Sequence, residues 1–134
     1  MTSTSSATST SSQTSPDFLD RAFALVDSMD IDAYLAMYTP DGRFTFGNAP
    51  AAEGKDAVRA GLEGFYSTIA GMSHAFVGKW WAEPEVGIVE AVVTYTRKDS
   101  STISLPVTTI YRLRDGLAAD VRVFMDVNPL FAAA

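Results

Sequence analysis

The fold is decided by residues 86–126, VGIVEAVVTYTRKDSSTISLPVTTIYRLRDGLAADVRVFMD. Three long apolar runs, Val86–Arg97, Thr102–Arg112 and Leu117–Asp126, are separated only by Asp99-Ser100-Ser101 and Asp115-Gly116. Residues of these types favour tight turns, so the pattern predicts three antiparallel strands joined as a meander.

Three helices are predicted before the meander. The first begins at Ser15-Pro16-Asp17, which combines a capping residue, a proline at the first helical position and an early acid. Asp30 is expected to cap a second, short helix, and Gly54 to start a third that Gly71 closes as its C-terminal glycine.

Two more strands complete the prediction, Arg43–Phe46 between the second and third helices and Ser73–Trp81 after the third. The predicted fold class is therefore α+β. A strongly curved antiparallel sheet is expected, with one face covered by the three helices of the N-terminal half, so that the sheet and helices enclose a pocket.

Residues Met1–Ser15 are nearly all Ser and Thr, and such a segment cannot bury enough apolar surface to offset the entropy of ordering it. We predict a disordered tail over residues 1–15 and a single domain over residues 16–134. The tail also lacks the charged and apolar regions of a secretory signal, which favours a cytoplasmic location.

Composition argues against several classes of function. The net charge is −6 with scattered basic residues, so nucleic acid is not an expected partner, and the apolar runs are too short to span a membrane. Because the chain has no cysteine and a single histidine, His74, no metal site is expected. We expect no cofactor either.

Five short stretches, in order along the chain, resemble a known family. They are DIDAYLAMY at residues 30–38, DGRF at 41–44, GKDAV at 54–58, LP at 105–106 and RVFMD at 122–126. They resemble the SnoaL-like branch of the nuclear transport factor 2-like superfamily, which implies a cone-shaped α+β barrel. The superfamily includes isomerases, cyclases, epoxide hydrolases, dehydratases and proteins without known catalysis, so the resemblance does not specify a reaction.

Relatives of the ketosteroid isomerase type use an Asp base, a Tyr and a second Asp. The resemblance carries these roles onto Phe46, Ala22 and Thr108, none of which can perform them. Proton abstraction beside a carbonyl needs a base and an acid, so ketosteroid isomerase activity is not expected.

Relatives of the limonene epoxide hydrolase type use an Arg-x-Asp pair and a last-strand Asp. Arg97-Lys98-Asp99 matches the pair, but it is predicted at a hairpin tip in water, and the last-strand position is Val123. An Asp-dependent epoxide hydrolase is therefore not expected. Asp126 is predicted to be structural, because its strand phase matches the outer face.

The same alignment predicts which side chains face the pocket. Strand residues expected to contact a ligand are Phe44, Phe46, Phe76, Trp80, Tyr95, Thr108, Val121, Val123 and Met125. Tyr34 and Tyr38 on the second helix either present hydroxyls to the ligand or pack in the core, and packing is favoured. A small apolar molecule is the expected partner.

His74 is the candidate catalytic residue, because only its side chain is suited to proton transfer near neutral pH. The alternative is a structural histidine bonded to the backbone, and the sequence offers no carboxylate to orient it as a base. Two functions follow: a cofactor-independent isomerase, cyclase or hydrolase, or a non-catalytic ligand-binding or dimerisation module.

Relatives dimerise through the outer face of the sheet, so the resemblance implies a homodimer. The strip expected to form the contact contains Arg122 and Phe124 together with Thr109 and Tyr111.

Overall fold

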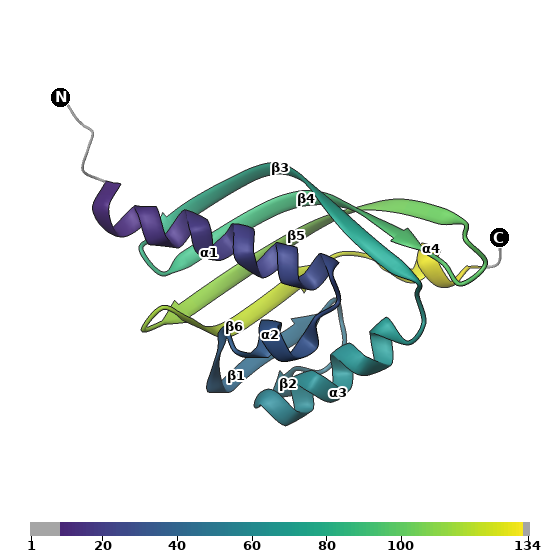
Figure 1. The fold of residues 1–134 in the computed structure, drawn as a ribbon, viewed down its shortest axis with the longest axis horizontal. Helices are drawn as coiled ribbons and strands as arrows, with labels where there is room; N and C mark the ends of the chain where they lie inside the picture. The colour runs from purple at the N-terminus through teal and green to yellow at the C-terminus, as the bar shows by residue number, and fades with distance from the viewer. Residues whose placement is uncertain (1–8, 133–134) are drawn as a thin grey trace.

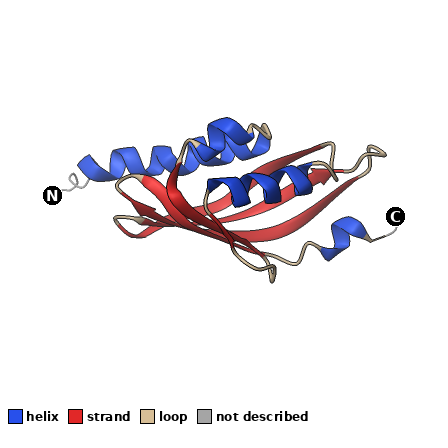
Figure 2. Cartoon of the chain, turned by 90° about the horizontal axis from the view of Figure 1, so that it is seen from below, coloured by secondary structure: helices blue, strands red, loops and turns tan. Residues whose placement is uncertain are grey.

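The computed structural model describes residues 9–132, with side chains over residues 18–132, and its architecture is α+β as predicted (Figure 1). Within these residues the helices are α1 (Ser9–Asp27), α2 (Ile31–Leu35), α3 (Lys55–Tyr66) and α4 (Asn128–Phe131). The strands are β1 (Tyr38–Phe46), β2 (Ala52–Glu53), β3 (Gly71–Glu83), β4 (Val86–Thr96), β5 (Thr102–Arg114) and β6 (Leu117–Phe124). They form one curved, unclosed sheet in the order β2-β1-β6-β5-β4-β3, and Figure 2 shows α1, α2 and α3 on one side of it.

The predicted meander is confirmed. β4 pairs with β5 without interruption from Val86↔Arg112 to Thr96↔Thr102, and β5 pairs antiparallel with β6. Asp115 and Gly116 both have positive φ, 54° and 80°, which is the conformation that a two-residue hairpin turn requires.

The sheet is mixed rather than wholly antiparallel, because β1 lies parallel to β6. Although β1 and β6 are neighbours in the sheet, residues 47–116 separate them in the sequence, so no local signal could indicate this pairing. β2 and α4 were also not predicted, and both are very short.

Helix α1 begins at Ser9, so the prediction of a helix start at Ser15-Pro16-Asp17 is wrong. Once the turn around Phe18 is formed, adding further residues costs less than nucleating a new helix, and Ser and Thr tolerate the helical conformation. The rest of the predicted tail, residues 1–8, lies outside the described residues.

Of the other predicted helix ends, two are confirmed and one is wrong. The Asp30 side chain caps α2 by accepting the Ala33 N–H at 3.1 Å, and Gly54 precedes α3 with φ 88°, both as predicted. Gly71 does not close α3, however. The helix ends at Tyr66 with Ser67 as its C-cap, and Gly71 is already the first residue of β3.

A β-bulge at Val77 reverses the faces of β3. Phe76 pairs with Ala91 and Gly78 pairs with Glu90, so Val77 has no partner on β4. The residues from Gly78 to Trp81 are shifted by one, so that Trp81 packs against the core whereas Trp80 is 52% exposed.

The core lies between the helices and the concave face of the sheet. Its buried strand residues alternate along β4 and β5, as in Val89, Ala91, Val93 and Tyr95. The residues between them, such as Ile88, Glu90 and Val92, face the convex side. No helix among the described residues is long and apolar enough to cross a membrane.

Candidate functional site

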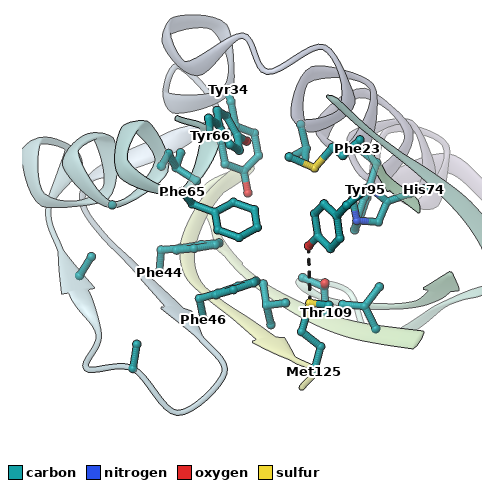
Figure 3. Close-up of a pocket in the computed structure, with 18 of the residues that line it drawn as sticks. Phe23, Tyr34, Phe44, Phe46, Phe65, Tyr66, His74, Tyr95, Thr109 and Met125 are labelled. Carbon is teal, nitrogen blue, oxygen red and sulfur yellow. Dashed lines mark hydrogen bonds between the residues drawn. The ribbon is translucent and has the colours of Figure 1, made fainter. Parts of the chain in front are cut away.

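A cavity of about 260 Å³ lies between the concave sheet and the helices (Figure 3). Its lining residues are Phe23, Val26, Tyr34, Phe44, Phe46, Ala49, Pro50, Ala52, Gly61, Leu62, Phe65, Tyr66, Met72, His74, Tyr95, Val107, Thr109, Tyr111, Val123 and Met125. Most of these side chains are apolar or aromatic, and the volume is slightly below that of a typical drug-sized site. The space therefore suits a small, largely apolar molecule.

His74 is held in this wall by a carboxylate. Its Nδ1 lies 2.6 Å from Asp27 Oδ1, and its backbone N–H donates to Asp27 Oδ2 at 2.9 Å. The His74 side chain is 8% exposed and that of Asp27 27% exposed. A carboxylate at Nδ1 favours the tautomer with a proton there, which leaves Nε2 with a free electron pair.

The expectation that no carboxylate orients His74 is therefore wrong. Asp27 lies 47 residues away in the sequence and reaches His74 because α1 crosses β3. The sequence contained one indication of this contact. Asp27 is the last residue of α1, where the helix dipole makes a negative charge unfavourable. A negative charge at that position indicates a partner elsewhere in the fold.

The cavity also contacts a cluster of tyrosines from three elements. The Tyr34 hydroxyl lies 3.0 Å from that of Tyr38 and 2.7 Å from that of Tyr111. Burial raises the pKa of all three phenols well above the usual value. Burial, with a smaller contribution from the Asp27 charge, raises the pKa of Tyr66 to about 12. All four side chains therefore stay protonated near neutral pH.

Seven of the residues predicted from sequence line the cavity: His74, Tyr34, Phe44, Phe46, Tyr95, Val123 and Met125. Figure 3 shows Phe44, Phe46 and Phe65 on one side, with Tyr95, His74 and Thr109 on the other. The Tyr95 hydroxyl faces the Met125 sulfur at 3.7 Å. The aromatic walls Phe23, Phe65 and Tyr66 come from helices and were not predicted as cavity residues.

Three predicted residues do not line the cavity, and strand register explains two of them, Trp80 and Thr108. Trp80 faces the convex side after the bulge, whereas Phe76 shares the inward phase of His74 and is 38% exposed, edge-on to Phe23. Thr108 pairs with Phe124 on the convex face, and its neighbour Thr109 occupies the predicted polar position instead.

Two others are buried behind the lining. Tyr38 belongs to β1 rather than to the second helix, and its hydroxyl contacts that of Tyr34. Val121 faces inward as predicted but is fully buried opposite Tyr111. Neither side chain lines the cavity.

The Arg97-Lys98-Asp99 motif lies at the β4–β5 hairpin, as predicted. Arg97 donates from Nε to the Leu130 carbonyl at 3.0 Å and from Nη2 to the Pro129 carbonyl at 3.1 Å. Asp99 accepts the Ser101 N–H and hydroxyl within the turn. The motif fixes the hairpin and the C-terminal helix, and it does not contribute to the cavity lining.

Asp126 is exposed, and its Oδ1 accepts the Asn128 N–H at 3.0 Å at the start of α4. This contact is structural. Over the part of the chain with described side chains, no three acidic or histidine side chains lie close enough together to hold a metal ion.

Comparison with known proteins identifies the fold. A family model described as the SnoaL-like domain matches residues 19–121. No curated protein matches by sequence.

Solved structures resemble the whole domain at low sequence identity. An NTF2-like protein of unknown function from Burkholderia pseudomallei K96243 has a TM-score of 0.79 at 18% identity, covering 88% of this chain and 95% of that one. A protein of Jannaschia sp. CCS1, proposed to be a SnoaL-like polyketide cyclase, has a TM-score of 0.77 at 18% identity over 89% and 90% of the two chains.

The epoxide hydrolase/cyclase-like enzyme SalBIII, which functions in pyran ring formation in salinomycin, has a TM-score of 0.75 at 16% identity. The alignment covers 87% of this chain and 94% of that one. At these identities the likeness establishes the fold alone.

Proposed function

Because the chain belongs to the SnoaL-like domain family, we propose that it is a cofactor-independent acid–base enzyme of the isomerase or cyclase type. In this proposal His74 accepts a proton from a small apolar molecule in the cavity. The observation that carries it is the His74–Asp27 pair, with an Nδ1–Oδ1 distance of 2.6 Å at the wall of an apolar cavity.

The chemistry follows from the orientation of the imidazole. With Nδ1–H donated to Asp27, Nε2 is the basic atom, and the carboxylate stabilises the imidazolium that forms when Nε2 takes a proton. The aromatic walls exclude water, which strengthens this electrostatic stabilisation. When the imidazolium returns the proton to another atom of the same carbanion, the reaction is an isomerisation. When the carbanion first attacks a carbonyl carbon of the same molecule, the imidazolium gives the proton to the alkoxide that forms, and the reaction is a ring closure.

A direct test is hydrogen–deuterium exchange into 1-tetralone, a small aromatic ketone with acidic hydrogens at C2. In heavy water, the wild-type protein is expected to accelerate deuterium uptake at C2, measured by mass spectrometry. His74→Phe should reduce exchange to the uncatalysed rate, because general acid–base catalysis contributes about 10²- to 10⁴-fold.

Two glycines of α3 provide a matched control for the location of the reaction. Gly61 lines the cavity and Gly64 does not, and no described heavy atom lies within 4 Å of a Cβ built on either. Gly61→Leu is expected to abolish exchange by filling the cavity, whereas Gly64→Leu should retain it. Equal exchange in both variants would place the reaction outside the cavity.

The second candidate function is a binding module without catalysis. Ketosteroid isomerase-type relatives carry catalytic groups at three positions, and this chain has Phe46, Ala22 and Thr108 there. None of these residues can perform the catalytic role of its counterpart, which favours binding without catalysis. If 1-tetralone binds but wild-type protein causes no exchange above the uncatalysed rate, this second function replaces the first.

We also propose that the chain is a homodimer formed through the convex face of the sheet. Thr109 and Tyr111 do not belong to this face, contrary to the prediction, because they pair with the inward-facing Val123 and Val121. The apolar strip on the convex face instead contains Trp80, Ile88, Ile110 and Phe124. Trp80 pairs with Ile88 and Ile88 pairs with Ile110 on neighbouring strands, and Phe124 lies beside them on β6. Trp80 and Phe124 are each 52% exposed, which favours a covered face.

Light scattering should therefore give a dimer mass at micromolar concentration. Phe124→Glu is expected to yield monomers, because it would bury two unpaired charges in a two-fold interface. Phe131→Glu is the matched control, since Phe131 is equally exposed, at 54%, but lies on α4. A monomeric wild-type protein would contradict the proposal.

A further inference from the structure

Arg97 holds the C-terminal helix α4 by its backbone. Its Nε donates to the Leu130 carbonyl at 3.0 Å and its Nη2 to the Pro129 carbonyl at 3.1 Å. Its third nitrogen, Nη1, donates to the Ser101 hydroxyl at 3.1 Å, so the planar guanidinium is itself fixed by the β4–β5 hairpin. Helix α4 is therefore tied to the hairpin beside which it lies in Figure 1.

Helix α4 places Phe131 against a wall of the cavity. The Phe131 ring lies edge-to-face on the Phe65 ring, with 6.3 Å between the centroids. Phe65 lines the cavity and Phe131 does not, so Phe131 contacts Phe65 from outside the cavity. Leu130, which precedes Phe131, is 4% exposed and anchors the helix in the core. The backbone of Phe131 is therefore fixed behind Phe65.

On its cavity side, Phe65 contacts two other lining rings. Its centroid lies 5.2 Å from that of Phe46 and 5.6 Å from that of Tyr95. Figure 3 shows the Phe65 ring projecting from α3 toward Tyr95. Phe65 is thus held between Phe131 on the outside and these two rings on the inside.

Phe65 is also the aromatic wall that can move most easily. It is half-buried, whereas the other aromatic lining residues of the helices, β4 and β5 are buried. Phe44 and Phe46 are half-buried too, but they belong to β1, which is paired with β6. Phe65 lies in the last turn of α3, which ends at Tyr66, and helix ends open at a lower cost than paired strands.

We propose that α4 is a stop that prevents Phe65 from moving outward, and so sets the largest ligand that the cavity admits. The cavity volume of about 260 Å³ is below the usual range, so a ligand with an additional ring must displace a wall. Arg97 is then a positioning residue that acts through α4 and Phe131. The inference rests on the proposed function, because it concerns the same cavity, and it names the substrate class: apolar molecules of two fused rings, with those of three excluded.

The test compares two ketones that differ by one fused ring, 1-tetralone and 3,4-dihydrophenanthren-1(2H)-one. Titration calorimetry gives their dissociation constants, and the ratio of the two constants measures the selectivity for size. Wild type is expected to bind the bicyclic ketone more tightly. In Phe131→Ala this selectivity should fall about tenfold, because one edge-to-face ring contact no longer resists the movement of Phe65.

Phe124→Ala is the matched control for Phe131→Ala. Phe124 is 52% exposed and Phe131 54% exposed, but Phe124 lies on the convex face of the sheet. Its selectivity is expected to stay at the wild-type value. An unchanged selectivity in Phe131→Ala would overturn the proposal, as would tighter binding of the tricyclic ketone to wild type or no binding of either ketone.

A double-mutant cycle shows whether Phe131 acts through Phe65. Phe65→Ala alone is expected to lower the selectivity, because it removes the wall itself. Adding Phe131→Ala to Phe65→Ala should then change nothing further, since the two residues act as one unit. Independent, additive effects of the two substitutions would contradict the stop.

Two substitutions test Arg97. Arg97→Met removes all three donors and should lower the selectivity as Phe131→Ala does, whereas Arg97→Lys keeps one cationic donor group and should restore part of it. Arg114→Met is the matched control, because it makes the same change at the opposite end of β5, where Arg114 pairs with Asp41. If Arg97 only stabilised the fold, Arg97→Met would weaken both ketones equally and leave the ratio unchanged, which would contradict its positioning role. If Arg97→Met does not fold, the cycle of Phe131 and Phe65 decides.

The outcome is separable from that of the proposed function, because the ratio of dissociation constants needs no turnover. A selectivity that depends on Phe131, without any wild-type exchange, would support the stop and refute the acid–base enzyme. Exchange that depends on His74, with a selectivity unaffected by Phe131→Ala, would do the reverse.

Discussion

Asp27→Asn is expected to reduce 1-tetralone exchange by about 10²- to 10⁴-fold with little change in ligand affinity. The two oxygens of Asp27 accept two N–H groups, the backbone N–H of His74 and its Nδ1–H. Asparagine has one oxygen and one amino group. Because the backbone N–H cannot turn away, the asparagine oxygen stays with it and the amino group faces Nδ1.

An amino group at Nδ1 selects the other imidazole tautomer, with the proton on Nε2. Nε2 is then a donor and cannot accept a proton from the substrate. The measurement is the initial rate of deuterium uptake as a function of pH, alongside the dissociation constant. An Asp27→Asn rate equal to wild type would show that His74 does not depend on Asp27.

Asp20→Asn is the matched control. It makes the same change of charge on the same helix, but Asp20 is 53% exposed and pairs with Lys79 instead of His74. Its exchange rate is expected to stay at the wild-type value. A fall comparable to that of Asp27→Asn would mean that the general charge of α1 controls the rate.

Gly42→Ala is expected to cost about 3 kcal/mol of unfolding free energy, the upper part of the range for overpacked sites. A Cβ on Gly42 would lie 2.7 Å from Tyr38 Cδ2, 3.0 Å from the Ala118 carbonyl oxygen and 3.2 Å from that of Thr39. The two oxygens belong to backbone that cannot easily move, since the Ala118 N–H is bonded to the Met37 carbonyl at 2.7 Å.

Urea unfolding, followed by circular dichroism, would measure this cost. Gly64→Ala is the control within the same chain, because its Cβ meets no described atom within 4 Å and alanine favours the helix interior. It is expected to gain about 0.5–1 kcal/mol. Equal stability of Gly42→Ala and wild type would contradict the close packing of β1 against β6.

The sequence by itself determined the elements whose signals are local. The turns at Asp99-Ser100-Ser101 and Asp115-Gly116 separated three strands correctly, and Asp30 indicated the cap of α2. These features depend on side chains and backbone within a few residues of one another. The resemblance to the SnoaL-like family, carried by the order of short motifs, was confirmed by the family match over residues 19–121.

The tertiary structure alone decided which side chains face one another. Trp81 packs inward and Trp80 outward because one residue of β3, Val77, has no partner on β4. Thr109 lines the cavity in the place predicted for Thr108, because Thr109 pairs with the inward-facing Val123. Side-chain direction in a strand alternates with every residue, so a single insertion or a change of register reverses it.

The candidate chemistry depends on contacts between distant elements for the same reason. Asp27 meets His74 from the end of α1, and the Tyr34 hydroxyl meets that of Tyr111 across 77 residues of sequence. The residues of each pair are too far apart in the sequence to be neighbours within one helix or strand. Each contact forms only when the helices pack on the concave face of the sheet. The sequence could identify His74 as the only histidine, but only the packed fold supplied the carboxylate that orients it.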